Sequence, residues 1–203
     1  SPCPFCADLL PNPLPEKICL LLRKIANQNS IVVMHLLKIA PTKISTPTSE
    51  DKLTFCEIHQ VETTIVSDSI QKGYLMQIDF GLLETRIFQM KTELLNIINR
   101  KANSYYCDFA LKICNKIGSR KARYYGQCGL NIISNILSKL FLDTNLLTYD
   151  LVFLKKPVDY LQEILVPETV LHLIFQDKGG LELELARKIM KDSANFGDYI
   201  YSE

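Results

Sequence analysis

The sequence predicts a mainly α fold, a single helical domain of about seven or eight helices with an N-terminal zinc knuckle of three cysteines and one histidine. Apolar residues recur at helical spacing along most of the 203 residues, and only residues 31–39 and 149–154 suit short strands. Prolines and glycines stand where helices would begin and end. Two pairs of metal-binding residues, each with a two-residue gap, precede residue 60.

The composition is that of an ordinary globular protein, with 47% hydrophobic and 22% charged residues. A net charge of +1 excludes a uniformly basic surface, so contact with nucleic acid would require a local patch. No apolar run reaches the roughly 18 residues of a membrane span, and no secretory signal is present. Because the chain opens almost directly on a ligand pair, we expect it to be cut from a longer protein.

The seven cysteines are an odd number, and without a secretory signal we expect them to be reduced and intracellular. Three of them belong to the two ligand pairs. The other four lie in apolar, periodic surroundings and are expected to be small core residues, since free cysteine is usually buried: Cys19, Cys107, Cys114 and Cys128.

The first expected helix follows a proline-punctuated turn at residues 10–16, and Pro15 suits its first turn, where a missing N–H has no cost. Residues 31–39 suit a buried strand or a helix, and residues 41–49 form an expected exposed loop. Ser49 is a candidate cap for the next helix, which ends at Gly73. These two helices have apolar stripes at helical spacing: Ile18, Leu21, Leu22 and Ile25, then Ile58, Val61, Ile65 and Ile70.

Asp79 is a natural cap for a long helix that reaches residue 98. A further helix is expected near residues 105–117, where Gly118 would stop it, and another over residues 130–142. Two of these helices have apolar inward faces: Leu83, Ile87, Met90, Leu94, Ile97 and Ile98 in the helix that reaches residue 98, and Ile133, Ile136, Leu137 and Leu140 in the helix over residues 130–142.

Residues 149–154 suit a short strand or an extended connector. Pro157 is expected to begin a helix through residue 165, and Pro167 another that ends at Gly179 and Gly180. The last expected helix covers residues 181–190, with Leu185, Ala186 and Ile189 on one face. Since no clear linker follows residues 41–49, we expect one domain over residues 1–203, with a zinc-binding part at 1–73 and a helical part at 74–203.

The strongest chemical signal is the pair Cys3 and Cys6 together with the pair Cys56 and His59. Thiolate sulfur and neutral imidazole suit Zn²⁺, which takes four tetrahedral ligands in structural sites. We expect the first pair on a tight turn and the second near the start of a helix, where residues i and i+3 share a face. The sequence therefore predicts a structural zinc ion that closes a loop of about fifty residues.

Two enzyme classes use similar residues. The cysteines from Cys3 to Cys6 match half of a zinc deaminase signature, but no histidine supplies its His-x-Glu. Cys56 and His59 are alternatively a nucleophile and base of a thiol or zinc hydrolase, although nothing marks an oxyanion hole. Glu62, one turn after His59, either orients the imidazole or is a solvated surface residue. We expect no enzymatic activity and no small-molecule substrate.

A second candidate site is a basic stretch without acidic residues, followed by a Tyr-Tyr-Gly turn. Cations would neutralise phosphates, tyrosines would stack on bases and glycines would let the backbone approach closely. The alternative is a solvated helix end, with the tyrosines in the core. The residues are Lys112, Lys116, Arg120, Lys121, Arg123, Tyr124 and Tyr125.

Several short motifs follow one another in order: Cys3-Pro4-Phe5-Cys6 with Leu10-Pro11, Phe55-Cys56-Glu57-Ile58-His59, Ile78-Asp79-Phe80 with Arg86-Ile87, Tyr124-Tyr125-Gly126 with Gly129, Leu165-Val166-Pro167-Glu168, and Ala186, Ile189, Met190 and Ser193. Together they resemble the C-terminal domain of the fungal restriction of telomere capping proteins, the fourth of that named set. This chain departs from the family at Leu75, where a proline is frequent, and at Gln127-Cys128, where proline and a basic residue are usual.

The resemblance implies a protein of the nucleus and cytoplasm that is linked to telomere capping and has no established enzymatic activity. Our leading interpretation is a zinc-stabilised, non-enzymatic module that restricts telomere capping and binds a protein partner in the nucleus, on chromatin or a telomere-associated protein. The basic stretch would be the contact surface. The alternative is direct binding of nucleic acid through residues 112–123. We expect no membrane association.

Overall fold

The structure is a computed structural model that describes residues 2–27, 47–112, 122–152, 155–180 and 182–201. Helices dominate these residues, and the described part of the chain contains no strand, only an isolated bridge between Pro2 and Leu9. The expected mainly α fold is confirmed. The chain divides into two compact units, Ser1–Tyr74 and Leu75–Glu203. None of the described helices is long and apolar enough to cross a membrane.

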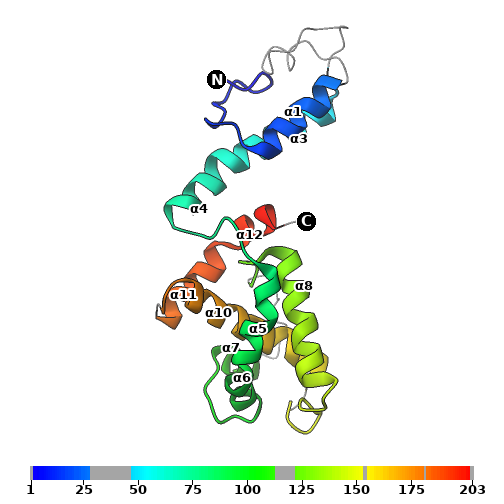
Figure 1. The fold of residues 1–203 in the computed structure, drawn as a ribbon, viewed down its shortest axis with the longest axis vertical. Helices are drawn as coiled ribbons and strands as arrows, with labels where there is room; N and C mark the ends of the chain where they lie inside the picture. The colour runs from blue at the N-terminus through cyan, green and yellow to red at the C-terminus, as the bar shows by residue number, and fades with distance from the viewer. Residues whose placement is uncertain (1, 28–46, 113–121, 153–154, 181, 202–203) are drawn as a thin grey trace. The chain divides into compact units, whose positions relative to one another are not determined.

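In the first unit, α1 (Glu16–Asn27) packs against α3 (Ser49–Val61), as Figure 1 shows. Pro15 directly precedes α1 and accepts a hydrogen bond from the backbone N–H of Cys19. Thr48, rather than the expected Ser49, caps α3 by accepting from the N–H of Asp51. Among the described residues of this unit, the buried core is a small cluster: Cys3, Leu10, Ile18, Leu22, Ile25, Ala26 and Phe55.

The helix that begins at Ser49 continues through a π-helical turn (Glu62–Val66) into α4 (Ser67–Gln71). The hydroxyls of Thr63 and Thr64 donate to the carbonyls of His59 and Gln60, one turn earlier. The turn rotates the buried face, so the expected stripe is wrong at Ile70, which is exposed, whereas Val66 is buried. Gly73 ends the helix with a positive φ of 68°.

In the second unit, Asp79 caps a short 3₁₀ turn (Phe80–Leu82) through the N–H of Gly81. The expected long helix is present as α5 (Leu83–Gln89) and α6 (Lys91–Ile98), which join at Met90, and its six expected core residues are all buried. Then come α7 (Tyr105–Lys112), whose expected continuation to 117 lies outside the described residues, and α8 (Gly126–Leu137) with a π-helical end (Ser138–Leu142).

The helix α9 (Pro157–Tyr160) runs through a π-helical turn (Leu161–Leu165) into α10 (Val166–Asp177). The break expected at Pro167 is therefore absent. Since proline offers no N–H to the preceding turn, the wider π turn just before it lets the helix continue. The described residues of the 149–154 segment form turns and not a strand.

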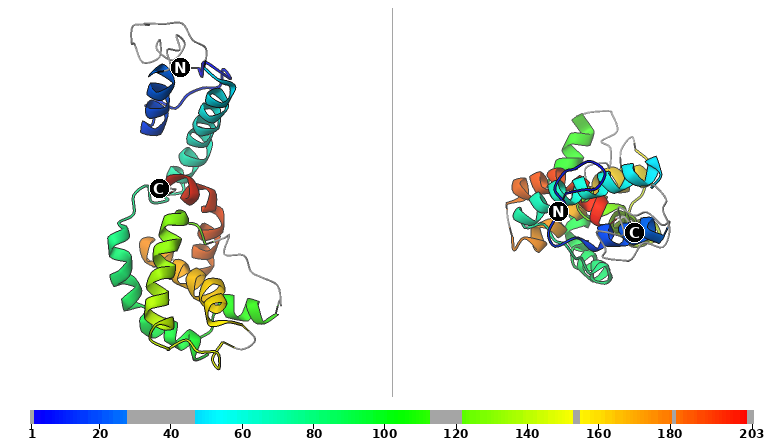
Figure 2. Two further views of the ribbon diagram at one scale, coloured as in Figure 1. Left: turned by 90° about the vertical axis from the view of Figure 1, so that its right-hand side faces the viewer. Right: turned by 90° about the horizontal axis from the view of Figure 1, so that it is seen from above.

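The chain ends with α11 (Leu183–Asp192) and α12 (Ala194–Ile200), the second of which was not expected. Leu185 is exposed, contrary to expectation, whereas Ala186 and Met190 are buried. The helix α10 is buried on nearly all sides and packs against α8 and α11. The helix α8 also packs against α5 and α12, and α5 and α8 lie side by side in Figures 1 and 2.

Candidate metal centre

The first unit brings the two predicted ligand pairs together. Cys3 and Cys6 lie on a turn that is closed by hydrogen bonds from the N–H of Ala7 to the carbonyl of Cys3 and from the N–H of Cys3 to the carbonyl of Asp8. The N–H of Phe5 also donates to Sγ of Cys3 at 3.4 Å. A thiolate at position 3 would gain from this donor, as metal-bound sulfur does.

The second pair comes from the later part of α3 and not from near its start. Cys56 and His59 are three residues apart and therefore share one face of the helix. The imidazole of His59 is fully buried, and its ring lies 5.7 Å from the ring of Phe55, which belongs to the small core. Core packing thus fixes the direction in which His59 points.

The four ligand atoms of Cys3, Cys6, Cys56 and His59 all lie within 4.8 Å of one another. Sγ of Cys3 is 3.9 Å from Sγ of Cys56, and Sγ of Cys6 is 3.1 Å from Nε2 of His59. Around a tetrahedral zinc ion with Zn–S bonds of about 2.3 Å, two sulfurs stand about 3.8 Å apart. The donors are thus of the right kind and close to the right spacing for one ion.

Without a cation, this cluster disfavours ionised thiols. Burial, followed by the neighbouring thiols of Cys6 and Cys3, raises the pKa of Cys56 from 9.0 to about 12. A divalent cation at the centre reverses this effect, because metal binding deprotonates its thiol ligands. The arrangement therefore has the chemistry of a metal site that has to exchange protons for an ion.

Nδ1 of His59 is buried and makes no hydrogen bond within the described part of the chain. Glu62 therefore does not orient this imidazole, and the alternative in which Glu62 acts on His59 is wrong for this structure. A catalytic pair of Cys56 and His59 would need a third group that orients the imidazole through Nδ1, and no described residue bonds to this atom. With Nε2 directed at the cluster, the single proton of a neutral, metal-bound imidazole would reside on Nδ1.

Among the remaining cysteines, Cys107 is buried, as expected, and Cys19 and Cys128 are partly buried. Cys114 lies outside the described residues. None of these three described thiols belongs to the cluster of candidate ligands. Within the described part of the chain, the one group of three or more candidate metal ligands is the set that the spacing selects.

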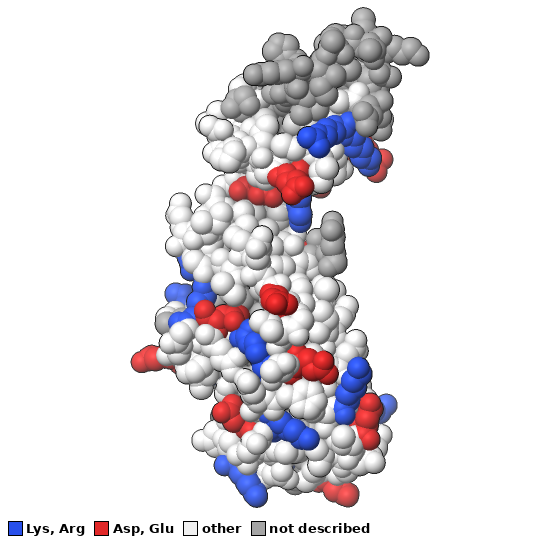
Figure 3. All heavy atoms as spheres, in the orientation of Figure 1, with Lys and Arg blue, Asp and Glu red and all other residues white. Residues whose placement is uncertain are grey.

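The basic stretch is only partly visible. Lys116, Arg120 and Lys121 lie outside the described residues, and Lys112 ends α7 with a side chain that is not described. Nη1 of Arg123 donates to Asp198 at 2.9 Å, so its charge is balanced within the second unit. On the face in Figure 3, the described basic and acidic side chains are interspersed.

The Tyr-Tyr-Gly turn belongs to the core. Tyr124 and Tyr125 are 1% and 0% exposed, so neither ring is available to stack on a base. The expectation that they contact nucleic acid is therefore wrong in this structure, and the core alternative holds. Gly126 begins α8 at a φ of 64°, and a Cβ there would meet the carbonyl of Gly197 at 2.5 Å. The absence of a side chain at Gly126 therefore allows α12 to pack closely, and it does not open the backbone to a phosphate.

Two further features have no counterpart in the expectations from sequence. Asp177 accepts from Nη2 of Arg86 at 2.8 Å and from the hydroxyl of Tyr125, which ties α5 and the start of α8 to the end of α10. Glu168 is 4% exposed although it carries a carboxylate. The sequence did contain a signal for this residue, because Glu168 directly follows a proline inside an apolar helix. A glutamate is seldom buried without a partner.

The family model of the RTC4-like domain matches residues 99–202, which is just over half of the chain. The match covers most of the second unit, and the four candidate metal ligands lie outside it. Searches of curated proteins and of solved structures returned no match.

Proposed function

Because this chain belongs to the RTC4-like domain family, we propose that it works in a telomere- or chromatin-related process as a zinc-stabilised, non-enzymatic module that binds a protein partner. Family membership supports the telomere-related context. The observation that carries the rest is the closed ligand set, in which four protein side chains surround one position. A zinc ion held by four protein ligands has no open position for a substrate and is structural.

Zinc is the metal that fits best. Three thiols and one imidazole form a recurrent structural zinc set, whereas harder ions such as Mg²⁺ and Ca²⁺ take oxygen ligands. The ligands would be Cys3, Cys6, Cys56 and His59. The ion supplies cross-linking here, and the chain supplies four donors that α3 and the N-terminal turn hold in place.

The first unit needs such a cross-link. Few of its described residues are fully buried and apolar, and a domain of this size buries too little surface to be very stable. Structural zinc contributes on the order of 10–16 kcal/mol of apparent free energy in small peptides. The ion would fasten the N-terminal segment to α3 and so determine whether the first unit is folded.

The metal test is direct. The purified chain, dialysed against chelator-free buffer, should contain one equivalent of zinc by elemental analysis, and Cys56→Ala should contain less than about a tenth of that. Cys19→Ala is the matched control, because its thiol lies in the same unit outside the cluster. A Cys56→Ala protein that keeps its zinc would contradict this ligand set.

The partner is proposed to be a protein of the nucleus, with the same chain also present in the cytoplasm. The basic stretch from Lys112 to Arg123 is the proposed contact surface, on sequence grounds. Capture of partners by the parent chain and by a Lys116→Glu plus Arg120→Glu variant tests this surface. The variant should lose a partner that the parent retains.

Direct nucleic-acid binding is the second candidate, and five cations without an acidic residue are the observation that favours it. It predicts DNA binding that weakens steeply with salt and that the same double variant abolishes. Equal DNA binding by parent and variant would exclude this stretch. The burial of Tyr124 and Tyr125 is the reason that the protein partner ranks first.

A further inference from the structure

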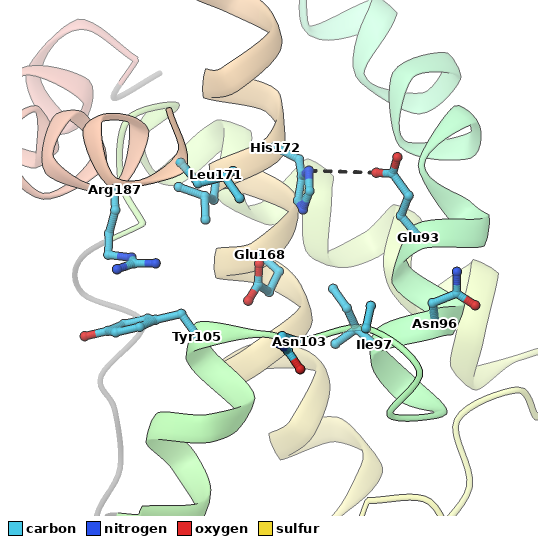
Figure 4. A pocket seen from close by; sticks show the side chains of 11 residues that line it. Glu93, Asn96, Ile97, Asn103, Tyr105, Glu168, Leu171, His172 and Arg187 are labelled. Carbon is cyan, nitrogen blue, oxygen red and sulfur yellow. Dashed lines mark ion pairs between the residues drawn. The ribbon is translucent and has the colours of Figure 1, made fainter. Parts of the chain in front are cut away.

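The second unit contains a pocket of about 230 Å³ that none of the preceding proposals uses. It lies where α6, the start of α7, α10 and the start of α11 meet (Figure 4). Glu168 stands in its middle, with Tyr105 and Arg187 on one side and Ile97 on the other. The pocket therefore combines a carboxylate, an aromatic ring and apolar walls in one small space.

Glu168 is buried without a cation. Its Oε1 accepts from the hydroxyl of Ser104 and, at 3.5 Å, from the backbone N–H of Tyr106. Both donors are neutral, and the ion pairs of the described residues do not include Glu168. A buried carboxylate is costly unless a positive charge compensates it, so Glu168 would stabilise a cation bound beside it.

Arg187 lines the same pocket but is engaged elsewhere. Nη1 of Arg187 donates to Glu184 at 2.7 Å, and the guanidinium carbon lies 3.7 Å from the centre of the Tyr105 ring. Its charge is therefore balanced by Glu184, and its plane is held against the aromatic face. Arg187 forms a wall of the pocket and is not the partner of Glu168.

A second carboxylate lies toward the pocket mouth. The side chain of Glu93 is 65% exposed, and its Oε2 is 3.8 Å from Nδ1 of His172. The apolar side chains of Ile97, Leu171 and Leu183 also line the pocket. An elongated ligand with a cationic head and an apolar stem matches this combination of carboxylates and apolar walls.

We infer that this pocket binds the side chain of a lysine or arginine from a partner protein. The head would reach Glu168, the methylene stem would lie along the apolar walls, and Glu93 would attract the charge at the entrance. At about 230 Å³, the pocket is smaller than the roughly 300–1,000 Å³ of typical ligand sites, which favours one side chain over a whole metabolite. The inference rests on the proposed protein-binding function and specifies the chemistry of the partner.

The test is an NMR titration of the whole chain with blocked amino acids. Nα-acetyl-lysine methylamide and Nα-acetyl-arginine methylamide should bind saturably and shift the amides of Asn103 and His172. Nα-acetyl-norleucine methylamide has the same stem without the charge and should bind at least about tenfold more weakly. Butylamine, a free amine without a backbone, should also bind more weakly than the blocked lysine.

Substitutions of the two carboxylates test which side chains bind the basic probes. Glu168→Gln should weaken binding of the basic probes at least about tenfold, and Glu93→Gln about two- to threefold. Glu84→Gln, on an exposed position of α5, is the matched control and should change nothing. If Glu168→Gln fails to fold, Leu183→Trp keeps the carboxylate but adds a large ring to the pocket wall, and it should abolish binding.

Three results would overturn the inference: no saturable binding of either basic probe, equal binding of the norleucine probe, or parent-like binding by a folded Glu168→Gln or Leu183→Trp variant. Butylamine that binds as tightly as the blocked lysine would identify a free amine in place of a protein side chain. If the blocked probes bind but no partner is captured, the interaction function fails while the pocket chemistry stands.

Discussion

Nε2 of His59 lies 3.1 Å from Sγ of Cys6, although the two residues are 53 positions apart in the sequence. The turn at Cys3–Cys6 and the later part of α3 meet only because α1 and α3 pack together around Phe55. The same fold places Sγ of Cys3 3.9 Å from Sγ of Cys56. Four side chains that could hold a metal ion therefore converge in one place.

Removal of the metal should unfold the first unit and spare the second. A chelator such as EDTA should abolish the protection of α1 and α3 against amide hydrogen exchange, because the proposed ion would supply much of their stability. The amides of α8 and α10 should keep their protection, since the candidate ligands are all in the first unit. Unchanged exchange in α3 after complete metal removal would contradict the structural role.

The buried pair of Arg86 and Asp177 should matter for stability more than any exposed pair. Arg86→Ala removes the ion pair and leaves the charge of Asp177 uncompensated. This charge is costly because the side chain of Asp177 is only 10% exposed. We expect a loss of about 2–4 kcal/mol in the free energy of unfolding of the second unit, measured in urea.

Glu184→Gln is the control for this comparison. It breaks the pair of Arg187 with Glu184, whose side chain is 78% exposed, and should cost less than about 1 kcal/mol. A loss as large as that of Arg86→Ala would show that burial does not determine the strength of these pairs.

The second unit should lose stability above pH 10. Burial, followed by the charge of Asp177, raises the pKa of Tyr125 above its ordinary 10.0. The folded state then holds the proton more tightly than the unfolded state, so this stabilisation is complete below pH 10 and declines as the pH rises further. Urea unfolding at pH 8, 10 and 11 measures how the free energy of unfolding changes with pH. Tyr125→Phe should make this free energy decline less steeply above pH 10. An equally steep decline in the variant would exclude Tyr125 as its source.

Gly197 should not tolerate a side chain. A Cβ at this position would stand 1.9 Å from the backbone carbonyl oxygen of Arg123, and backbone atoms cannot be displaced cheaply. Gly197→Ala should therefore destabilise the second unit by about 3 kcal/mol or more. Asn195→Ala, on the exposed side of the same helix, should stay within about 0.5 kcal/mol, and similar losses for both variants would contradict the close approach.

The cluster of candidate metal ligands was predictable because its signal is local. A two-residue gap in each pair, between residues of zinc-binding type, is sufficient to identify Cys3, Cys6, Cys56 and His59. Most helices of the second unit were predictable for a related reason, since their apolar faces repeat every three to four residues. The π-helical turn before Pro167 was not, because proline ordinarily ends a helix and the compensation lies in the backbone geometry.

The pocket and the buried tyrosines depend on contacts between distant segments. Glu168 lies in the pocket because α10 meets the loop before α7 and the start of α11, and no sequence spacing encodes that meeting. Tyr124 and Tyr125 resemble an exposed aromatic pair beside basic residues, yet α12 covers the start of α8, where they lie. The helix α12 itself was missed because it is short and has Gly197 in its interior.

The central claim is that four side chains hold one structural zinc ion, and X-ray absorption at the zinc edge tests it most directly. The chain purified without added chelator should show a four-coordinate zinc with three sulfur neighbours at about 2.3 Å and one nitrogen neighbour at about 2.0 Å. Replacement of His59 by cysteine should convert the shell to four sulfurs. A protein that is fully folded without zinc, or a zinc shell that contains oxygen ligands, would contradict the account.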